Sequence, residues 1–278
     1  MQDAFAYCAE LVRQADRDRY LAALFAPAER RGALHALYAF NVEVVRVRDA
    51  AREPLPGEIR LQWWADVLNG ERREEAGANP VAAALLTTMG RHGLVASLLT
   101  ALIEAHRFDL YDEPMADIAA LETYAKATSS ALVALAAQIL TGFGAEAAAG
   151  PAGLAGAIAG LLHALPAHAA QHRLYVPLDL LVRHAVSPSD IFAGQSSPGL
   201  SAALTELRDI ARRHLAAAGE RIAALPREAL PAFLPLAPVR PLLDRLDRCD
   251  AFAPAELSAW RRQWLIWRAA RNPDRIGG

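Results

Sequence analysis

The chain has 278 residues, of which 54% are hydrophobic and 22% charged, and its formal net charge is −2. This hydrophobic content excludes a disordered chain, and the near-neutral charge excludes the global basic field that draws proteins to nucleic acid. Cys8 and Cys249 show no C-x-x-C spacing. The sequence therefore indicates neither a disulfide framework nor a cysteine metal site.

Apolar residues recur at helical spacing along nearly the whole chain, and the alternation typical of strands is scarce. The pattern predicts helices over residues 4–16, 28–51, 57–73, 80–91, 95–111, 118–140, 152–165, 200–224, 227–247 and 255–271. The prolines between Leu225 and Pro241 exclude one regular helix there and predict kinks. Since no flexible linker or fixed repeat divides the chain, we expect one all-α domain, a helical bundle over residues 1–278.

The sequence carries no targeting or membrane-spanning signal. Its N-terminus shows neither a basic region followed by an apolar one nor an arginine-rich transit pattern. The most apolar stretches, 130–140 and 152–165, are shorter than the ~20 residues that cross a bilayer, and they predict buried helices. We expect a cytoplasmic protein without a signal peptide or transmembrane helix, whose membrane contact would be peripheral, at the inner face.

Four short strings carry a family resemblance: LYAF at 37–40, LQWW at 61–64, NPV at 79–81 and RLYVP at 173–177. In these strings and in the order of its helices, the chain resembles the squalene/phytoene synthases over roughly residues 5 to 270. The resemblance implies the isoprenoid synthase fold, a helical bundle around an apolar cavity. It also implies two aspartate-rich helices at the cavity mouth, whose carboxylates hold Mg²⁺ ions that bridge to a diphosphate.

Both of these acidic motifs are largely erased. The D-D-x-x-D positions of the first motif fall on Val45, Arg46 and Asp49, so that only Asp49 offers a carboxylate. Glu43 lies about 160° or more around the helix from Val45 and cannot substitute. A cation at position 46 opposes metal binding electrostatically.

The second motif, N-x-x-x-D-x-x-x-D in the family, falls on Gly160, Ala164 and His168, counted back from Arg173. None of these three residues offers the oxygen ligand that the motif requires. Pro166 interrupts the helix where the ligands would share one face. We therefore expect no metal, no cofactor and no identifiable catalytic residue.

The replacing residues resemble a non-catalytic branch of the same family, the mitochondrial complex I assembly factors. The matching strings are AFNVE at 39–43 with VRD at 47–49, and LHALPAH at 162–168. This branch implies a protein partner, a subunit or assembly intermediate of respiratory complex I.

Further residues suit either a structural or a functional role. His163, His168 and His172 include an i, i+4 pair that can share a metal, although Pro166 and the lack of a third ligand favour structural histidines. Residues 43, 46, 49 and 52 are charged and follow one another at i, i+3 steps. This spacing favours a salt-bridged helix face, and the alternative makes Arg46 an anion ligand at the former diphosphate position.

Two repeating patterns remain open at the level of sequence. Gly153, Gly156 and Gly160 make one helix face small, which suits either close helix packing or a lipid tunnel. On the last helix, Trp260, Trp264 and Trp267 form an i, i+4, i+7 stripe. Four arginines flank it: Arg261, Arg262, Arg268 and Arg271. The default interpretation of this stripe is core docking, and the alternative is a membrane interface or a partner surface.

Three functional hypotheses follow. The first is a non-catalytic family member that acts in complex I assembly by binding a protein partner at the membrane surface. The second is a Mg²⁺-dependent head-to-head transferase that joins two isoprenyl diphosphates. The third is a binding protein for a lipid or isoprenoid in the apolar cavity. The expected ligand or partner contacts are Arg46, His163, Arg173, Tyr175 and the three tryptophans, and no nucleic-acid module is present.

Overall fold

The computed structural model describes residues 2–51 and 53–276, and these residues form helices and no strand, which confirms the all-α prediction. The first half contains α1 (Gln2–Ala15), α2 (Arg17–Ala23), α3 (Ala28–Ala50), α4 (Pro54–Leu68), α5 (Arg73–Ala78), α6 (Pro80–His92) and α7 (Ala96–Arg107), followed by the short 3₁₀ turn η1 (Phe108–Leu110). The central part contains α8 (Ile118–Ala125), the π turn η2 (Lys126–Ser130), α9 (Ala131–Thr141), α10 (Glu146–His163) and α11 (Leu165–Ala170). The remainder contains α12 (Leu178–Arg183), α13 (Pro188–Phe192), α14 (Pro198–Ile222), η3 (Arg227–Ala232), η4 (Leu234–Leu236), α15 (Val239–Leu246), α16 (Ala259–Arg271) and η5 (Pro273–Arg275).

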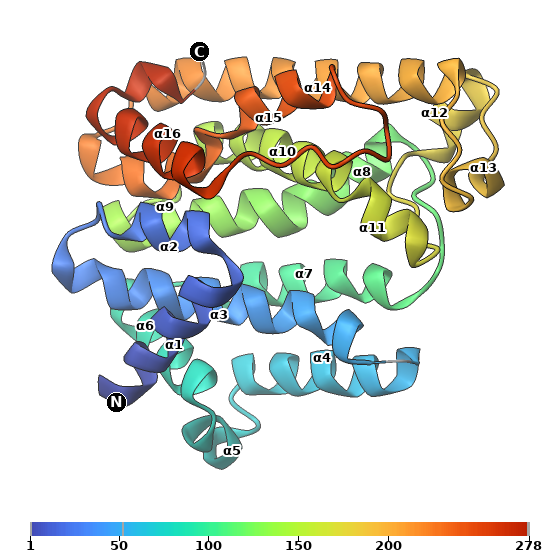
Figure 1. The fold of residues 1–278 in the computed structure, drawn as a ribbon. Helices are drawn as coiled ribbons and strands as arrows, with labels where there is room; N and C mark the ends of the chain where they lie inside the picture. The colour runs from blue at the N-terminus through green and yellow to red at the C-terminus, as the bar shows by residue number, and fades with distance from the viewer. Residues whose placement is uncertain (1, 52, 277–278) are drawn as a thin grey trace.

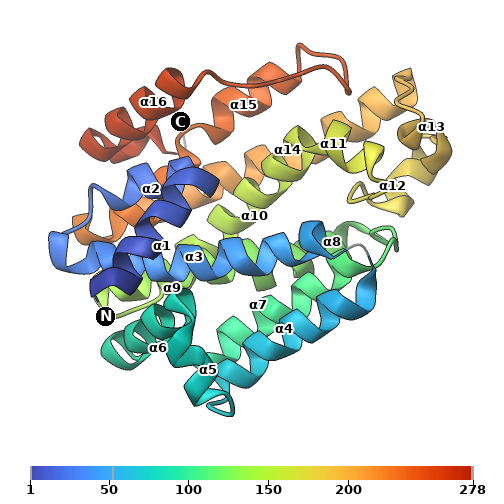
Figure 2. The ribbon, with the colours of Figure 1, turned by 60° about the horizontal axis from the view of Figure 1, so that its bottom comes forward.

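The long helices stack in layers, with α4 on one side of the bundle and α14 on the other (Figure 1). The most extensive helix–helix contact joins α10 to α14, and α3 packs on α1, α6 and α9 (Figure 2). Burial of apolar faces at these contacts supplies the main driving force for folding. The buried cluster runs without interruption from Cys8 on α1 to Ile276 after η5.

Most of the predicted long helices are present, and local chemistry explains where their ends differ. α4 begins at Pro54, because proline suits the first turn of a helix. It ends at Leu68 rather than near residue 73, and Gly70 follows with φ of +80°, a conformation that glycine adopts without strain. α6 begins after Asn79, whose side-chain oxygen accepts hydrogen bonds from the backbone N–H groups of Val81 and Ala82.

The sequence did not predict the short helices α2, α5, α11, α12 and α13, which have five to seven residues each. Segments of this length span at most two turns, so their apolar residues cannot show a clear helical period. The predicted kinks between 225 and 241 are confirmed: Pro231 lies inside η3, Pro235 lies in η4, and α15 begins only after Pro238.

The stretches 130–140 and 152–165 are largely buried within α9 and α10, as predicted. Within the described residues, none of the helices combines the length and the hydropathy needed to cross a bilayer.

Candidate functional site

Two cavities meet inside the bundle. The larger, of about 460 Å³, is bordered by α3, the π turn, α10 and the segment after α11. The smaller, of about 270 Å³, extends toward η4, α15 and α16. Six residues line both cavities: Asp16, Arg19, Ser129, Leu132, Gly156 and Gly160. The two cavities therefore adjoin.

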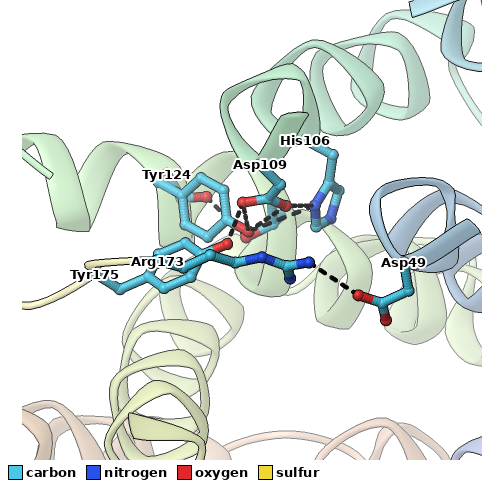
Figure 3. A network of polar contacts seen from close by, with 7 residues as sticks. Asp49, His106, Asp109, Tyr124, Arg173 and Tyr175 are labelled. Carbon is cyan, nitrogen blue, oxygen red and sulfur yellow. Dashed lines mark hydrogen bonds and ion pairs between the residues drawn. The ribbon is translucent and has the colours of Figure 1, made fainter. Parts of the chain in front are cut away.

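All three residues of the predicted first motif, Val45, Arg46 and Asp49, line the larger cavity from α3. The Asp49 carboxylate accepts a hydrogen bond from an Nη atom of Arg173 at 3.0 Å, and this ion pair crosses the cavity mouth (Figure 3). Among the described residues, no ion pair joins Glu43, Arg46 and Asp49 to one another, so this part of the predicted salt-bridged face is absent. Its fourth member, Arg52, lies outside the described residues.

The second-motif positions separate. Gly160 lines both cavities, whereas Ala164 lies at the junction of α10 and α11 and lines neither. His168 lines the larger cavity and packs its ring on that of Tyr175, with 4.7 Å between ring centroids. Burial lowers the pKa of His168, and the charge of Arg173 lowers it further.

The predicted helix break is present, with Pro166 in the first turn of α11. The backbone nevertheless keeps the hydrogen bonds from Ala164 N to Gly160 O and from His168 N to Ala164 O, both 2.9 Å. Missing oxygen ligands, more than a lost helical register, therefore distinguish these positions from a metal-binding helix.

The residues at the mouth do not fit magnesium. Mg²⁺ requires near-octahedral oxygen ligands, and Asp49 is the only carboxylate at the six motif positions. Arg46, Arg48 and Arg173 also line this cavity, and their positive charges oppose the binding of a cation. Among the described residues, no three His, Cys, Asp or Glu side chains gather closely enough to hold a metal ion.

The cavity mouth instead offers unsatisfied donors. Arg46 has no ion pair among the described residues and is exposed at the mouth. The buried Nε atoms of Arg48 and Arg173 lack hydrogen-bond partners within the part of the chain that the structure describes. Guanidinium groups with free N–H donors are suited to bind carboxylate or phosphate oxygens.

A buried network around Asp109 forms part of the cavity wall (Figure 3). Its carboxylate lies 2.6 Å from Nδ1 of His106 and accepts hydrogen bonds from the hydroxyls of Tyr175 at 2.6 Å and Tyr124 at 3.0 Å. Burial raises the pKa of both tyrosines, and the negative charge of Asp109 raises it further. The hydroxyls thus stay protonated and act as donors to Asp109.

The sequence predicted only Tyr175 from this network. Asp109, His106 and Tyr124 come from η1, α7 and α8, and nothing in their local sequence marks them as neighbours. The sequence feature that could have indicated this network is the HRFD segment at 106–109, which places three ionisable residues at the end of a predicted amphipathic helix.

The three histidines considered for a metal site point to different places. His163 lines the smaller cavity, and its buried Nδ1 lacks a hydrogen-bond partner in the described part of the chain. Burial lowers the pKa of His163, and nearby Arg262 lowers it further. His172 packs against Phe192, with 5.2 Å between ring centroids, and it does not share a metal site with the other two histidines.

The three glycines of the predicted small face, three of the four in α10, all line the cavities, and one of them also permits close packing. A Cβ atom on Gly153 would lie 2.2 Å from the backbone N of Ser130, so this glycine permits close packing of α10 on the π turn. Gly156 and Gly160 face the cavities, and a Cβ on Gly160 would meet nothing within 4 Å. Gly153 therefore serves close packing and also lines the smaller cavity, whereas Gly156 and Gly160 line both cavities.

The tryptophans of α16 do not dock in the core, contrary to the default interpretation. Trp260, Trp264 and Trp267 are exposed, and the helix instead buries Ile266 and Ala269.

Comparisons with known proteins agree with the fold. The squalene/phytoene synthase family profile matches residues 12–268. The NADH dehydrogenase (ubiquinone) complex I assembly factor 6 of Rattus norvegicus is 32% identical over 250 residues, which cover 89% of this chain and 75% of the rat protein. A phytoene synthase of Thermus thermophilus is 30% identical over 275 residues, covering 93% of this chain and 91% of that one.

Among solved structures, a dehydrosqualene synthase in complex with a ligand superimposes with a TM-score of 0.83 at 18% identity, over 97% of this chain and 96% of that chain. This likeness confirms the expected fold of isoprenoid synthases.

Proposed function

Because this chain belongs to the squalene/phytoene synthase family, we propose that it is a non-catalytic member that acts in the assembly of respiratory complex I. The observation that carries the proposal is the composition of the two motifs, because five of the six metal-ligand positions hold residues without a carboxylate. The identity to a mammalian complex I assembly factor supports the assignment of role.

The arrangement at the mouth explains why diphosphate chemistry would fail. In a metal-dependent transferase, the departing diphosphate leaves with its charge neutralised by bound cations. Here the surviving carboxylate, Asp49, is paired with Arg173, and no second acidic residue faces it from α10. The chain would therefore act by binding, and the proposed partner is a complex I subunit or an assembly intermediate.

The test is deletion of the gene in the source organism, followed by native gel analysis of membrane complexes and measurement of NADH oxidation. We expect less assembled complex I and slower NADH oxidation, both restored by the wild-type gene and by Asp49→Asn. Normal complex I in the deletion strain would refute the proposal. Failure of Asp49→Asn alone would indicate that the carboxylate is needed and would favour an active enzyme.

The catalytic alternative is tested in vitro. Purified protein is incubated with farnesyl or geranylgeranyl diphosphate and Mg²⁺, and diphosphate release is measured. We expect none above the rate without protein. Turnover that yields a joined isoprenyl product and is abolished by Asp49→Ala would establish a prenyltransferase.

The retained hollow favours a second candidate function, binding of an amphiphile with an anionic head group without a metal ion. The two adjoining cavities offer an elongated space, and Arg46, Arg48 and Arg173 gather at one end of it. An acyl or isoprenyl chain would lie along Gly156 and Gly160, and its head group would accept hydrogen bonds from the arginines.

Farnesyl diphosphate in buffer with EDTA is a suitable probe, with native mass spectrometry as the readout. We expect a bound adduct that Arg46→Gln weakens and Gly160→Leu, which fills the hollow, abolishes. Arg221→Gln, on the distant end of α14, is the matched charge control and should bind normally. Absence of an adduct in the wild type, or binding only with Mg²⁺, would refute this candidate.

A further inference from the structure

The outward face of α16 is a ridge of aromatic side chains. Trp260, Trp264 and Trp267 are 69%, 44% and 43% exposed, whereas Ile266 is 1% exposed and Ala269 is fully buried on the inner side. At about 100° per residue, the three indoles lie within about 60° of one another on the helix surface. α16 itself lies at the outer edge of the bundle (Figure 2).

The charge of this helix has one sign. α16 carries four arginines and no carboxylate, and of these only Arg262 has an ion pair among the described residues, with Asp18 of α2. Two others stack on the exposed indoles: the guanidinium of Arg268 lies 4.8 Å from the ring centroid of Trp264, and that of Arg271 lies 4.0 Å from Trp267. The ridge is therefore both aromatic and cationic, within a chain whose net charge is −2.

We propose that this ridge docks the protein on an anionic membrane surface. Indoles favour the bilayer interface because one part of the ring system is apolar and the N–H remains wet. Arginines on the same helix add attraction to anionic head groups, and stacking on an indole keeps a guanidinium close to the surface into which the ring inserts. Charge complementarity thus selects the occupant.

A second copy of the chain fits the same face less well. A two-fold contact would place the identical ridge on both sides and bring Arg261, Arg268 and Arg271 of each copy together. None of these three arginines has a carboxylate partner within the described residues that would offset the repulsion. A bilayer supplies the opposite charge and needs no matching hollow.

The proposal is independent of the proposed function, because it uses no residue of the cavity. Its test is co-sedimentation of the full chain with vesicles of phosphatidylcholine alone, and with vesicles of equal parts phosphatidylcholine and phosphatidylglycerol. We expect salt-sensitive binding to the anionic vesicles and little binding to the neutral ones.

Two variants separate the contributions of rings and charges. The triple variant W260A/W264A/W267A should lower the partition coefficient about tenfold or more, and its fold should be intact because these rings lie outside the core. Replacing Arg261, Arg268 and Arg271 by glutamine should lower it about fivefold per arginine and remove the salt sensitivity. Circular dichroism checks that both variants keep the helical content of the wild type.

The matched control is L55A/I59A, which removes two apolar side chains that are 69% and 63% exposed on α4. It should bind anionic vesicles like the wild type. Wild-type protein that stays in the supernatant at low salt would overturn the proposal, and so would equal losses in the control and the tryptophan variant. A dimer in light scattering that the tryptophan variant disrupts would assign the ridge to self-association instead.

Discussion

Asp109→Asn is the substitution that should reveal how the cavity wall is held together. The carboxylate of Asp109 accepts hydrogen bonds from two tyrosine hydroxyls and lies 2.6 Å from Nδ1 of His106, and its side chain is only 11% exposed. Hydrogen bonds to a charged group contribute about 1.5–3 kcal/mol each. Asparagine keeps one acceptor oxygen for Tyr175 but places an amide donor where the second oxygen faces His106 and Tyr124.

We therefore expect Asp109→Asn to lower the free energy of unfolding by about 2–4 kcal/mol, the loss of one or two such bonds. For a chain of this size, that loss lowers Tm by roughly 3–7 °C. Urea unfolding followed by circular dichroism, together with calorimetry, measures both quantities.

The control for this substitution is Asp112→Asn, three residues further along the same segment. The side chain of Asp112 is 67% exposed and forms one ion pair, with Arg48 at 3.0 Å. Exposed pairs contribute about 0–1 kcal/mol, so we expect a change below ~1 kcal/mol. If Asp109→Asn costs no more than Asp112→Asn, the network does not stabilise the wall and the reasoning is refuted.

Burial lowers the pKa of His35 to about 4, so protonation of the unfolded chain should remove about 3 kcal/mol of stability as the pH falls from ~6.5 to ~4. In His35→Phe, which keeps the stacking on Tyr20, the urea midpoint should fall less between pH 7 and pH 4.5 than it does in the wild type. An equal fall in the two proteins would contradict this prediction. Gly153→Ala should lower the free energy of unfolding by about 1–3 kcal/mol, because the added Cβ would collide with the backbone of Ser130. Gly160→Ala should raise it by about 0.5–1 kcal/mol, because the added Cβ would meet no atom within 4 Å. Similar shifts of Tm in calorimetry for the two variants would show that Gly153 does not hold α10 against Ser130.

The sequence predicted the helical fold, because helical periodicity is a local pattern, whereas the positions of the two metal motifs came from the family resemblance. It correctly indicated the break near Pro166 and the kinks around Pro231, since proline acts on its own backbone. The pairing of Asp49 was not predictable in the same way. A helical repeat suggested partners on α3, whereas the structure brings Arg173 to it from 124 residues away.

The side that the α16 tryptophans face was not predictable from local pattern either. An i, i+4, i+7 stripe of large side chains suits both a core face and an outer ridge. The direction is decided by what the helix packs on, here α2 and η4, which contact the side that carries Ile266 and Ala269. The spacing of the three tryptophans therefore predicted that α16 is a helix, but not which of its faces is buried.

The cavity walls are held by interactions that need no metal ion. In a metal site, carboxylates on facing helices repel one another and are held together by the bound cations. Here Arg173 supplies a fixed cation to Asp49 across the same mouth, and the segment that carries Arg173 is anchored two residues later by the hydrogen bond from Tyr175 to Asp109. Since neither interaction needs a metal, the walls can keep their positions after the ligands are replaced. The hollow can thus keep its shape without a metal ion at its mouth.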